Sequence, residues 1–115
     1  ARTCYDHLAG EVAVAIYAFL LREAWIVPDG SALTASGEAQ FARLGITLPA
    51  GNRRRVCCAC LDWSERRFHP GGAVGAALLE HGQRKGWFTL TPGFREVSIT
   101  RTGRLALRQH FHLQL

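Results

Sequence analysis

The sequence predicts an α+β fold in which two similar units, each made of a helix, a β-ribbon and a second helix, pack together as one domain. The first observation is size, because 115 residues that are 48% hydrophobic can enclose one compact core but not two ordinary domains. The second is an internal repeat, and the third is that both copies carry the same helix, turn and capping signals. We therefore expect a single domain, residues 1–115, with pseudo-repeats at about 4–44 and 60–111 joined by a linker at 45–56.

The repeat runs without gaps over the length of one helix. Adding 62 to the residue number gives six identities in the twenty positions from 7 to 26, which pair His7, Gly10, Val12, Ala15, Arg22 and Trp25 with His69, Gly72, Val74, Ala77, Arg84 and Trp87. Upstream the offset is 56, so that C-x-D recurs and the second copy holds six extra residues, WSERRF. Downstream the offset is 66, which aligns LTASG, at 33–37, with ITRTG, at 99–103.

Each copy carries element signals in the same order. Apolar residues recur at helical spacing over residues 8–24 and, more weakly, over residues 73–85. The segment after each tryptophan turns at P-D-G in the first copy and at P-G in the second, which predicts a short and a longer β-ribbon. Thr34 and Thr100 stand where an N-cap hydroxyl would begin the last helix of each copy, over residues 35–44 and 101–111.

Helix, two-stranded wing and helix is the outline of half a winged-helix module, and the second copy is the better likeness. We therefore expect two tandem winged-helix-like repeats. The alternative is that each copy is only a compact α+β packing unit, because a fold does not fix a function.

Two motifs carry a resemblance to a known family. RTCYDHLAG, at 2–10, together with CLDWSERRFHPGGAVGAALL, at 60–79, resembles the C-terminal region of a bacterial branch of ArsR-type winged-helix transcriptional regulators. The resemblance covers nearly the whole chain. The sequence departs from the family pattern in two places: Pro-Gly-Gly follows His69 in place of Leu-Ala-Gly, and Cys57 and Cys58 precede the single expected cysteine.

The resemblance implies a function. In that branch an N-terminal winged-helix domain, absent from this chain, binds DNA and dimerises. The chain is then expected to be the C-terminal effector-sensing or dimer-supporting domain of a regulator and not an enzyme. The implied partners are DNA through the absent domain, a homodimer, and a small-molecule or metal effector. The alternatives are a winged-helix module that itself binds DNA and a cysteine-dependent enzyme, with Cys60 as nucleophile, His69 as base and Asp62 as orienting acid.

The residues that the two motifs share are the candidates for an effector or metal site: Cys4, Asp6, His7, Cys60, Asp62 and His69. Thiolates and imidazoles are the ligands of tetrahedral zinc, and the repeat supplies them as two Cys–His pairs that we expect to gather between the halves. The long gap between Cys60 and His69 and the missing Cys-x-x-Cys pairs count against a metal.

The other interpretation of the motifs is packing and hydrogen bonding. It has Asp6 and Asp62 at helix starts, Trp63 packed within the motif, and Arg66 and Arg67 donating to carboxylates such as Asp6.

The charge of the chain is compatible with DNA. Lys plus Arg outnumber Asp plus Glu by 14 to 9, a net charge of +5. Arg53, Arg54 and Arg55 are candidates for contacts with the DNA backbone, the alternative being a solvated loop. No stretch of about 18 apolar residues is free of charge, so we expect no membrane partner. Four cysteines without a secretory signal predict a cytoplasmic protein.

Overall fold

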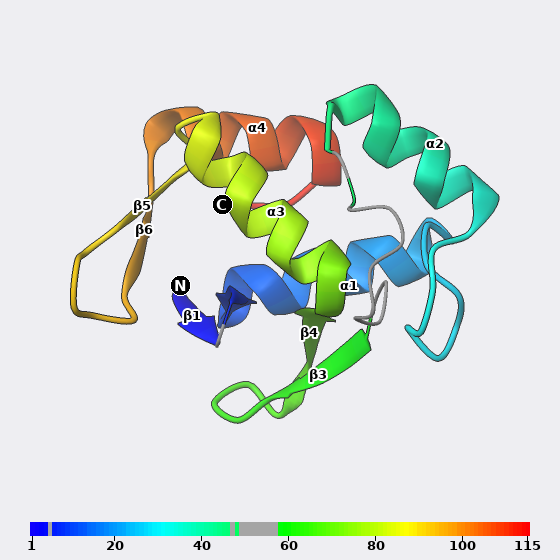
Figure 1. Ribbon diagram of the computed structural model, residues 1–115, viewed down its shortest axis with the longest axis horizontal. Helices are drawn as coiled ribbons and strands as arrows, with labels where there is room; N and C mark the ends of the chain where they lie inside the picture. The colour runs from blue at the N-terminus through cyan, green and yellow to red at the C-terminus, as the bar shows by residue number, and fades with distance from the viewer. Residues whose placement is uncertain (5, 47, 49–57) are drawn as a thin grey trace.

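The computed structural model describes residues 1–4, 6–46, 48 and 58–115. Within that part of the chain it shows four helices and three two-stranded antiparallel sheets, so the predicted α+β class is confirmed (Figure 1). The elements, in chain order, are β1 (Arg2–Cys4), β2 (His7–Ala9), α1 (Glu11–Arg22), α2 (Ala35–Leu44), β3 (Cys58–Asp62), β4 (Arg67–Gly71), α3 (Gly72–Arg84), β5 (Phe88–Leu90), β6 (Val97–Ile99) and α4 (Arg101–Phe111). The winged-helix likeness of each half stays a prediction.

Each half begins with a β-hairpin that helical spacing does not reveal. β1 pairs with β2, and β3 pairs with β4, both antiparallel. The spacing predicts a helix from residue 8, but residues 7–9 form β2. Gly10, with φ at 96°, supplies the bend after which α1 begins at Glu11.

The two ribbons differ in length, as the offsets predict. In the second half β5 pairs with β6, and the Phe94 N–H donates to the Thr91 carbonyl at 3.0 Å across a turn in which Gly93 has φ of 82°. In the first half a single bridge joins Ile26 and Leu33. The predicted first ribbon is therefore reduced to one bridge, because its segment is shorter by the four residues that separate offsets 62 and 66.

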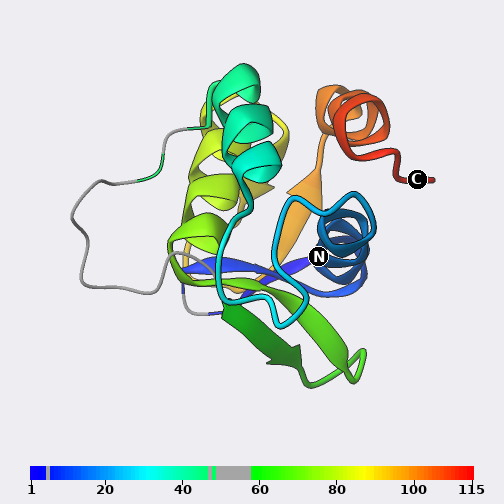
Figure 2. The same cartoon turned by 90° about the vertical axis from the view of Figure 1, so that its right-hand side faces the viewer.

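The halves are not separate lobes, because each central helix packs mainly on the hairpin of the other half. α1 lies against β4, and α3 lies against β2. Figures 1 and 2 show α1 and α3 above the β3–β4 hairpin. The N-terminal strand also joins the second half, since the Thr3 N–H donates to the Arg95 carbonyl at 2.7 Å and the Val97 N–H donates to the Ala1 carbonyl at 2.9 Å. The exchange produces one shared core.

Aromatic rings fill the core between the helices. Phe19 of α1 meets Trp25 edge-on, with centroids 5.0 Å apart, and meets Phe111 of α4 at 5.6 Å. Trp25 in turn meets Phe41 of α2 at 5.6 Å. All four side chains are buried, and such edge-on pairs add about 0.5–1.5 kcal/mol each beyond the apolar area they bury. These contacts attach α2 and α4 to α1.

The T-x-x-G motif begins the last helix of each half in the same way. Thr34 and Thr100 are the N-caps of α2 and α4, as predicted, and their hydroxyl oxygens accept from the N–H groups of Gly37 and Gly103 at 2.9 Å. The N–H of each threonine donates to the carbonyl of the tryptophan of its own half at 2.9 Å. The helix then lies so close to the tryptophan that a Cβ atom on either glycine would clash with the same carbonyl.

We expect Gly37→Ala and Gly103→Ala each to lower the free energy of unfolding by about 1–3 kcal/mol, because the helix has to move away from the tryptophan carbonyl. Urea denaturation followed by tryptophan fluorescence measures the change. Ser36→Ala is the control, because Ser36 is exposed in α2, the helix that contains Gly37. Its free energy of unfolding should stay within about 0.5 kcal/mol of that of the unaltered chain. If the glycine variants match the control, close approach is not what requires glycine there.

His81 of α3 is a buried base that resists protonation. It is 3% exposed, its ring is edge-on to Trp87 with centroids 5.1 Å apart, and its Nδ1 accepts from Arg84 at 3.2 Å. Burial lowers the pKa of His81 below its ordinary 6.5, and the neighbouring cations Arg84 and Lys85 lower the pKa further.

We expect the free energy of unfolding to fall as the pH is lowered through 6.5, the ordinary pKa of His81. The unfolded chain then binds a proton at His81 that the folded chain resists, whereas above that pH both states are neutral and stability is complete. His81→Gln should make the decline shallower, measured by urea denaturation above and below pH 6.5. An unchanged slope would mean that the folded protein accommodates the imidazolium.

Candidate functional site

Each hairpin presents one cysteine opposite one histidine. Cys4 of β1 is the register partner of His7 of β2, and Cys60 of β3 is the register partner of His69 of β4. Cross-strand partners have Cβ atoms about 4.5–5.5 Å apart, so the two side chains of a pair can reach one point.

The six extra residues of the second copy lie beyond this pair, at the far end of its hairpin. Two of them, Arg67 and Phe68, make two further register pairs with Asp62 and Leu61, and the other four, residues 63–66, form the loop. The gap between Cys60 and His69 that counts against a metal in the sequence is therefore closed by strand pairing, and that objection is wrong.

The two Cys–His pairs face each other between the halves. The Sγ atoms of Cys4 and Cys60 are 4.0 Å apart, and the Nε2 atoms of His7 and His69 are 3.1 Å apart. All four ligand atoms lie within 4.8 Å of one another, with the histidines buried and the cysteines half-buried. The structure thus brings together the four side chains that the repeat predicts to gather.

Asp62 links this cluster to α1 and to the N-terminus. Its side chain is completely buried. One carboxylate oxygen accepts from the Gly10 N–H at 2.6 Å and from Nδ1 of His69 at 3.0 Å. The other oxygen accepts from the Arg2 guanidinium at 2.9 Å.

The loop after β3 completes the shell around the same carboxylate. The Ser64 hydroxyl donates to it at 2.9 Å, and the Glu65 N–H donates to it at 3.1 Å. Burial opposes ionisation of Asp62, but the hydrogen bonds from Gly10, Glu65, Ser64 and His69 outweigh burial and hold the pKa of Asp62 well below its usual range. Asp62 is therefore a carboxylate that can only accept.

The two carboxylates assign the histidine tautomers. Because Asp62 accepts, Nδ1 of His69 carries the proton and Nε2 of His69 keeps its lone pair. Nδ1 of His7 lies 3.3 Å from Oδ1 of Asp6 in the same relation. Burial lowers the pKa of His69 below 6.5, and the hydrogen bond to Asp62 offsets this in part. The Nε2 atoms of the two rings face each other, 3.1 Å apart.

Other predicted site residues lie elsewhere. Trp63 is 84% exposed, and Arg66 and Arg67 are exposed, so the prediction that they pack within the motif is wrong. The hairpin turns at residues 63–66, with Arg66 at φ of 56°, and Arg67 begins β4 next to that turn, so all three side chains lie at the exposed end of the hairpin. Arg53, Arg54, Arg55 and Cys57 lie outside the described residues.

The prediction that Asp6 and Asp62 stand at helix starts is also corrected. Asp6 precedes β2 and Asp62 ends β3, and Asp62 reaches a helix start only through space, at Gly10. The guanidinium that meets a buried carboxylate belongs to Arg2. Sequence reasoning missed Arg2, Gly10 and Ser64 as members of the site, since their partner is more than fifty residues away in two of the three cases.

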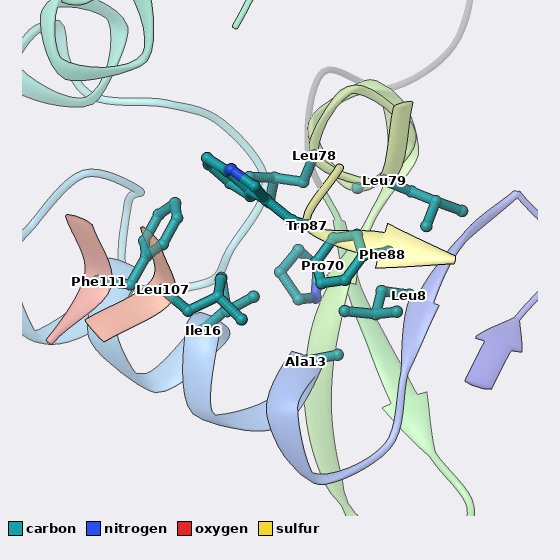
Figure 3. A pocket seen from close by; sticks show the side chains of 11 residues that line it. Leu8, Ala13, Ile16, Pro70, Leu78, Leu79, Trp87, Phe88, Leu107 and Phe111 are labelled. Carbon is teal, nitrogen blue, oxygen red and sulfur yellow. The ribbon is translucent and has the colours of Figure 1, made fainter. Parts of the chain in front are cut away.

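A small apolar cavity lies beside the cluster, between the two halves (Figure 3). Leu8, next to His7, and Pro70, next to His69, line it together with Ile16 of α1, Leu78 of α3 and Phe111 of α4. Its free volume of about 10 Å³ is close to the minimum for one water molecule. The cavity is therefore too small, as it stands, for an organic effector.

We expect Asp62→Asn to lower the free energy of unfolding by about 3–5 kcal/mol, the usual cost of removing one partner of a buried ion pair. Both oxygens of Asp62 accept from donors, so the amide NH₂ would face a donor in either orientation. Urea denaturation measures the loss. Asp29→Asn is the control, because Asp29 accepts similar bonds from Ser31 in an exposed turn, and its loss should be much smaller. Equal losses would contradict a role for burial.

Comparisons with known proteins give one informative likeness. No protein-family model matches the chain, and no solved structure matches it. A protein of Bacillus subtilis (strain 168), named "Uncharacterized HTH-type transcriptional regulator YdfF", is 37% identical over 119 aligned positions that include all of this chain. The chain spans 53% of that protein's length. Along its whole length, the chain is thus similar to about half of an HTH-type transcriptional regulator.

Proposed function

We propose that this chain is the effector-sensing or dimer-supporting part of a DNA-binding transcriptional regulator, and that a separate helix-turn-helix domain reads the DNA. The observation that carries the proposal is the whole-chain likeness to a regulator of about twice the length. The motifs around Cys4 and Cys60 favour the C-terminal region of the ArsR type. A cytoplasmic location follows from such a role, and within the described residues no helix is long and apolar enough to cross a membrane.

The burial of α3 argues against the alternative that the chain reads DNA itself. A recognition helix offers an exposed face to the major groove. α3 precedes the ribbon as such a helix would, but eight of its thirteen residues are buried, including Val74 and Leu78. Its exposed side carries Glu80 and Arg84, whose side chains form an ion pair at 3.7 Å. Entry into a groove would require α3 to leave the core.

Among the described residues, α4 carries an exposed basic face. Arg101, Arg104 and Arg108 are exposed at spacings of three and four residues, so they share one face of α4. Such a face can contact phosphates without reading bases. It supports weak, sequence-independent attraction to DNA at most.

The histidine cluster does not favour the enzyme alternative. Nε2 of His69, the atom that would take a proton from Cys60, lies 3.1 Å from Nε2 of His7. The first hairpin repeats the same thiol, imidazole and carboxylate, which a single nucleophilic site would not need. The cluster instead joins the two halves, so a ligand there would fix one hairpin relative to the other. A coupling of that kind is what an effector site requires.

We expect this chain alone to bind random duplex DNA with a Kd no tighter than about 10⁻⁴–10⁻⁶ M at physiological salt, with strong salt dependence. Fluorescence anisotropy with a labelled duplex measures the affinity. The triple variant with Arg101, Arg104 and Arg108 changed to Gln should reduce the binding and the salt slope, whereas a variant with Glu80→Gln should not reduce them. Tight, sequence-specific binding by the chain would overturn the proposal in favour of a DNA-reading module.

A further inference from the structure

We propose that Cys4, His7, Cys60 and His69 bind one zinc-like divalent cation, which links the two hairpins and thereby the two halves of the chain. This inference goes beyond the regulatory role and does not rest on it. A metal that only stabilises the fold and a metal that acts as the effector would use the same four ligands.

The distances between the four atoms fit a tetrahedral ion. Zinc bonds of about 2.3 Å to sulfur and about 2.0–2.1 Å to nitrogen place the two sulfurs about 3.8 Å apart, the two nitrogens about 3.3 Å apart and each sulfur about 3.6 Å from each nitrogen. The observed separations are 4.0 Å for the sulfurs and 3.1 Å for the nitrogens. All four atoms lie within 4.8 Å of one another. Side-chain rotations that move these atoms by about an ångström would complete the coordination.

The facing imidazoles point to a cation between them. With Nδ1 of each ring directed at a carboxylate, both Nε2 atoms face the space between the hairpins, 3.1 Å apart. A metal ion in that space would bind both nitrogens. It would also bind the two thiols that lie beside the rings.

The surrounding carboxylates have the arrangement that supports metal-binding histidines. A histidine ligand usually donates its second N–H to a carboxylate, which fixes the ring and makes the other nitrogen a better ligand. His69 has Asp62 in that role, at 3.0 Å, and His7 has Asp6, at 3.3 Å. Asp62 is itself held by Arg2 and by the Gly10 N–H, so its position does not depend on the metal.

The ligand set selects the class of metal. Two thiolates with two imidazoles favour Zn²⁺ and other soft or borderline ions over Mg²⁺ and Ca²⁺, which take oxygen ligands. Four protein ligands close the coordination sphere, as in structural zinc sites. Because the two cysteines are separated by 56 residues in the chain, one ion would join segments that are distant in sequence.

Cobalt titration of the purified chain tests the site. Co²⁺ at a four-coordinate site with thiolates gives strong visible absorption and charge-transfer bands, which hexaaquo Co²⁺ lacks. We expect saturation at one equivalent, displacement of Co²⁺ by one equivalent of Zn²⁺, and no displacement by Mg²⁺. Addition of Zn²⁺ should also raise the Tm of the chain, because the ion binds the folded state.

Variants assign the ligands. Asp6→Ala should weaken Zn²⁺ binding by about 10–100-fold, the usual effect of losing a carboxylate behind a histidine ligand. Cys60→Ser and His7→Gln should weaken it more than Asp6→Ala does. Cys57→Ser and His112→Gln remove a thiol and an imidazole from outside the four ligands, and they should bind as the unaltered chain does. Circular dichroism of each metal-free variant separates lost ligands from lost fold.

Three results would overturn the proposal: no tetrahedral Co²⁺ spectrum in the reduced chain, full affinity in both Cys60→Ser and Cys4→Ser, or loss of binding in Cys57→Ser. None of these measurements involves DNA. If the chain binds metal but has no role in transcription, these tests succeed and only the regulatory proposal fails. If it is part of a regulator but binds no metal, these tests fail and the regulatory proposal stands.

Discussion

The ionised carboxylate of Asp62 is the interaction on which the rest of this structure depends. It lies in the interior, yet it accepts from four parts of the molecule: the N-terminal Arg2, the backbone before α1, the loop after β3, and His69. A buried charge is tolerated only where such donors surround it. The carboxylate belongs to the second half and the donors at Arg2 and Gly10 to the first, so these hydrogen bonds join the two halves around their shared core. The same carboxylate determines which nitrogen of His69 faces the centre of the molecule.

The repeat predicted the parts of the fold whose signals are local. Thr34 and Thr100 cap the helices that they were expected to cap, and the turns fall at the glycines that the sequence marks. The first hairpin was missed because β1 and β2 are only three residues long, too short for an alternating pattern. The second was missed although β3 and β4 have five residues each, because Cys58–Asp62 and Arg67–Gly71 do not alternate between apolar and polar residues. The exchange of hairpins between the halves was missed for a different reason. Nothing in one copy states whether its helix packs on its own hairpin or on that of its partner.

The candidate site, like the fold, was predicted in part. Matching Cys4 with Cys60 and His7 with His69 by offset alone identified the four side chains that converge. Spacing along the chain gave the opposite indication, because ten residues from cysteine to histidine look too long for one ion until they fold into a hairpin. Trp63, Arg66 and Arg67 were assigned to packing from their place in the motif. Their exposure follows from the longer hairpin, which carries the extra residues away from the core.

The two halves of the cluster are equivalent in sequence but not in constraint. The Asp62 side chain is fully buried, and it holds His69 within a network of backbone and side-chain donors. The Asp6 side chain is 33% exposed, and it lies 0.3 Å further from its histidine than Asp62 does, at 3.3 Å against 3.0 Å. His69 is thus held by a fully buried carboxylate and His7 by a partly exposed one. The first hairpin also pairs with the backbone beside β6 through β1. Through β2 and β1 the cluster is therefore connected by hydrogen bonds to the ribbon ahead of α4, the helix with the exposed arginine face.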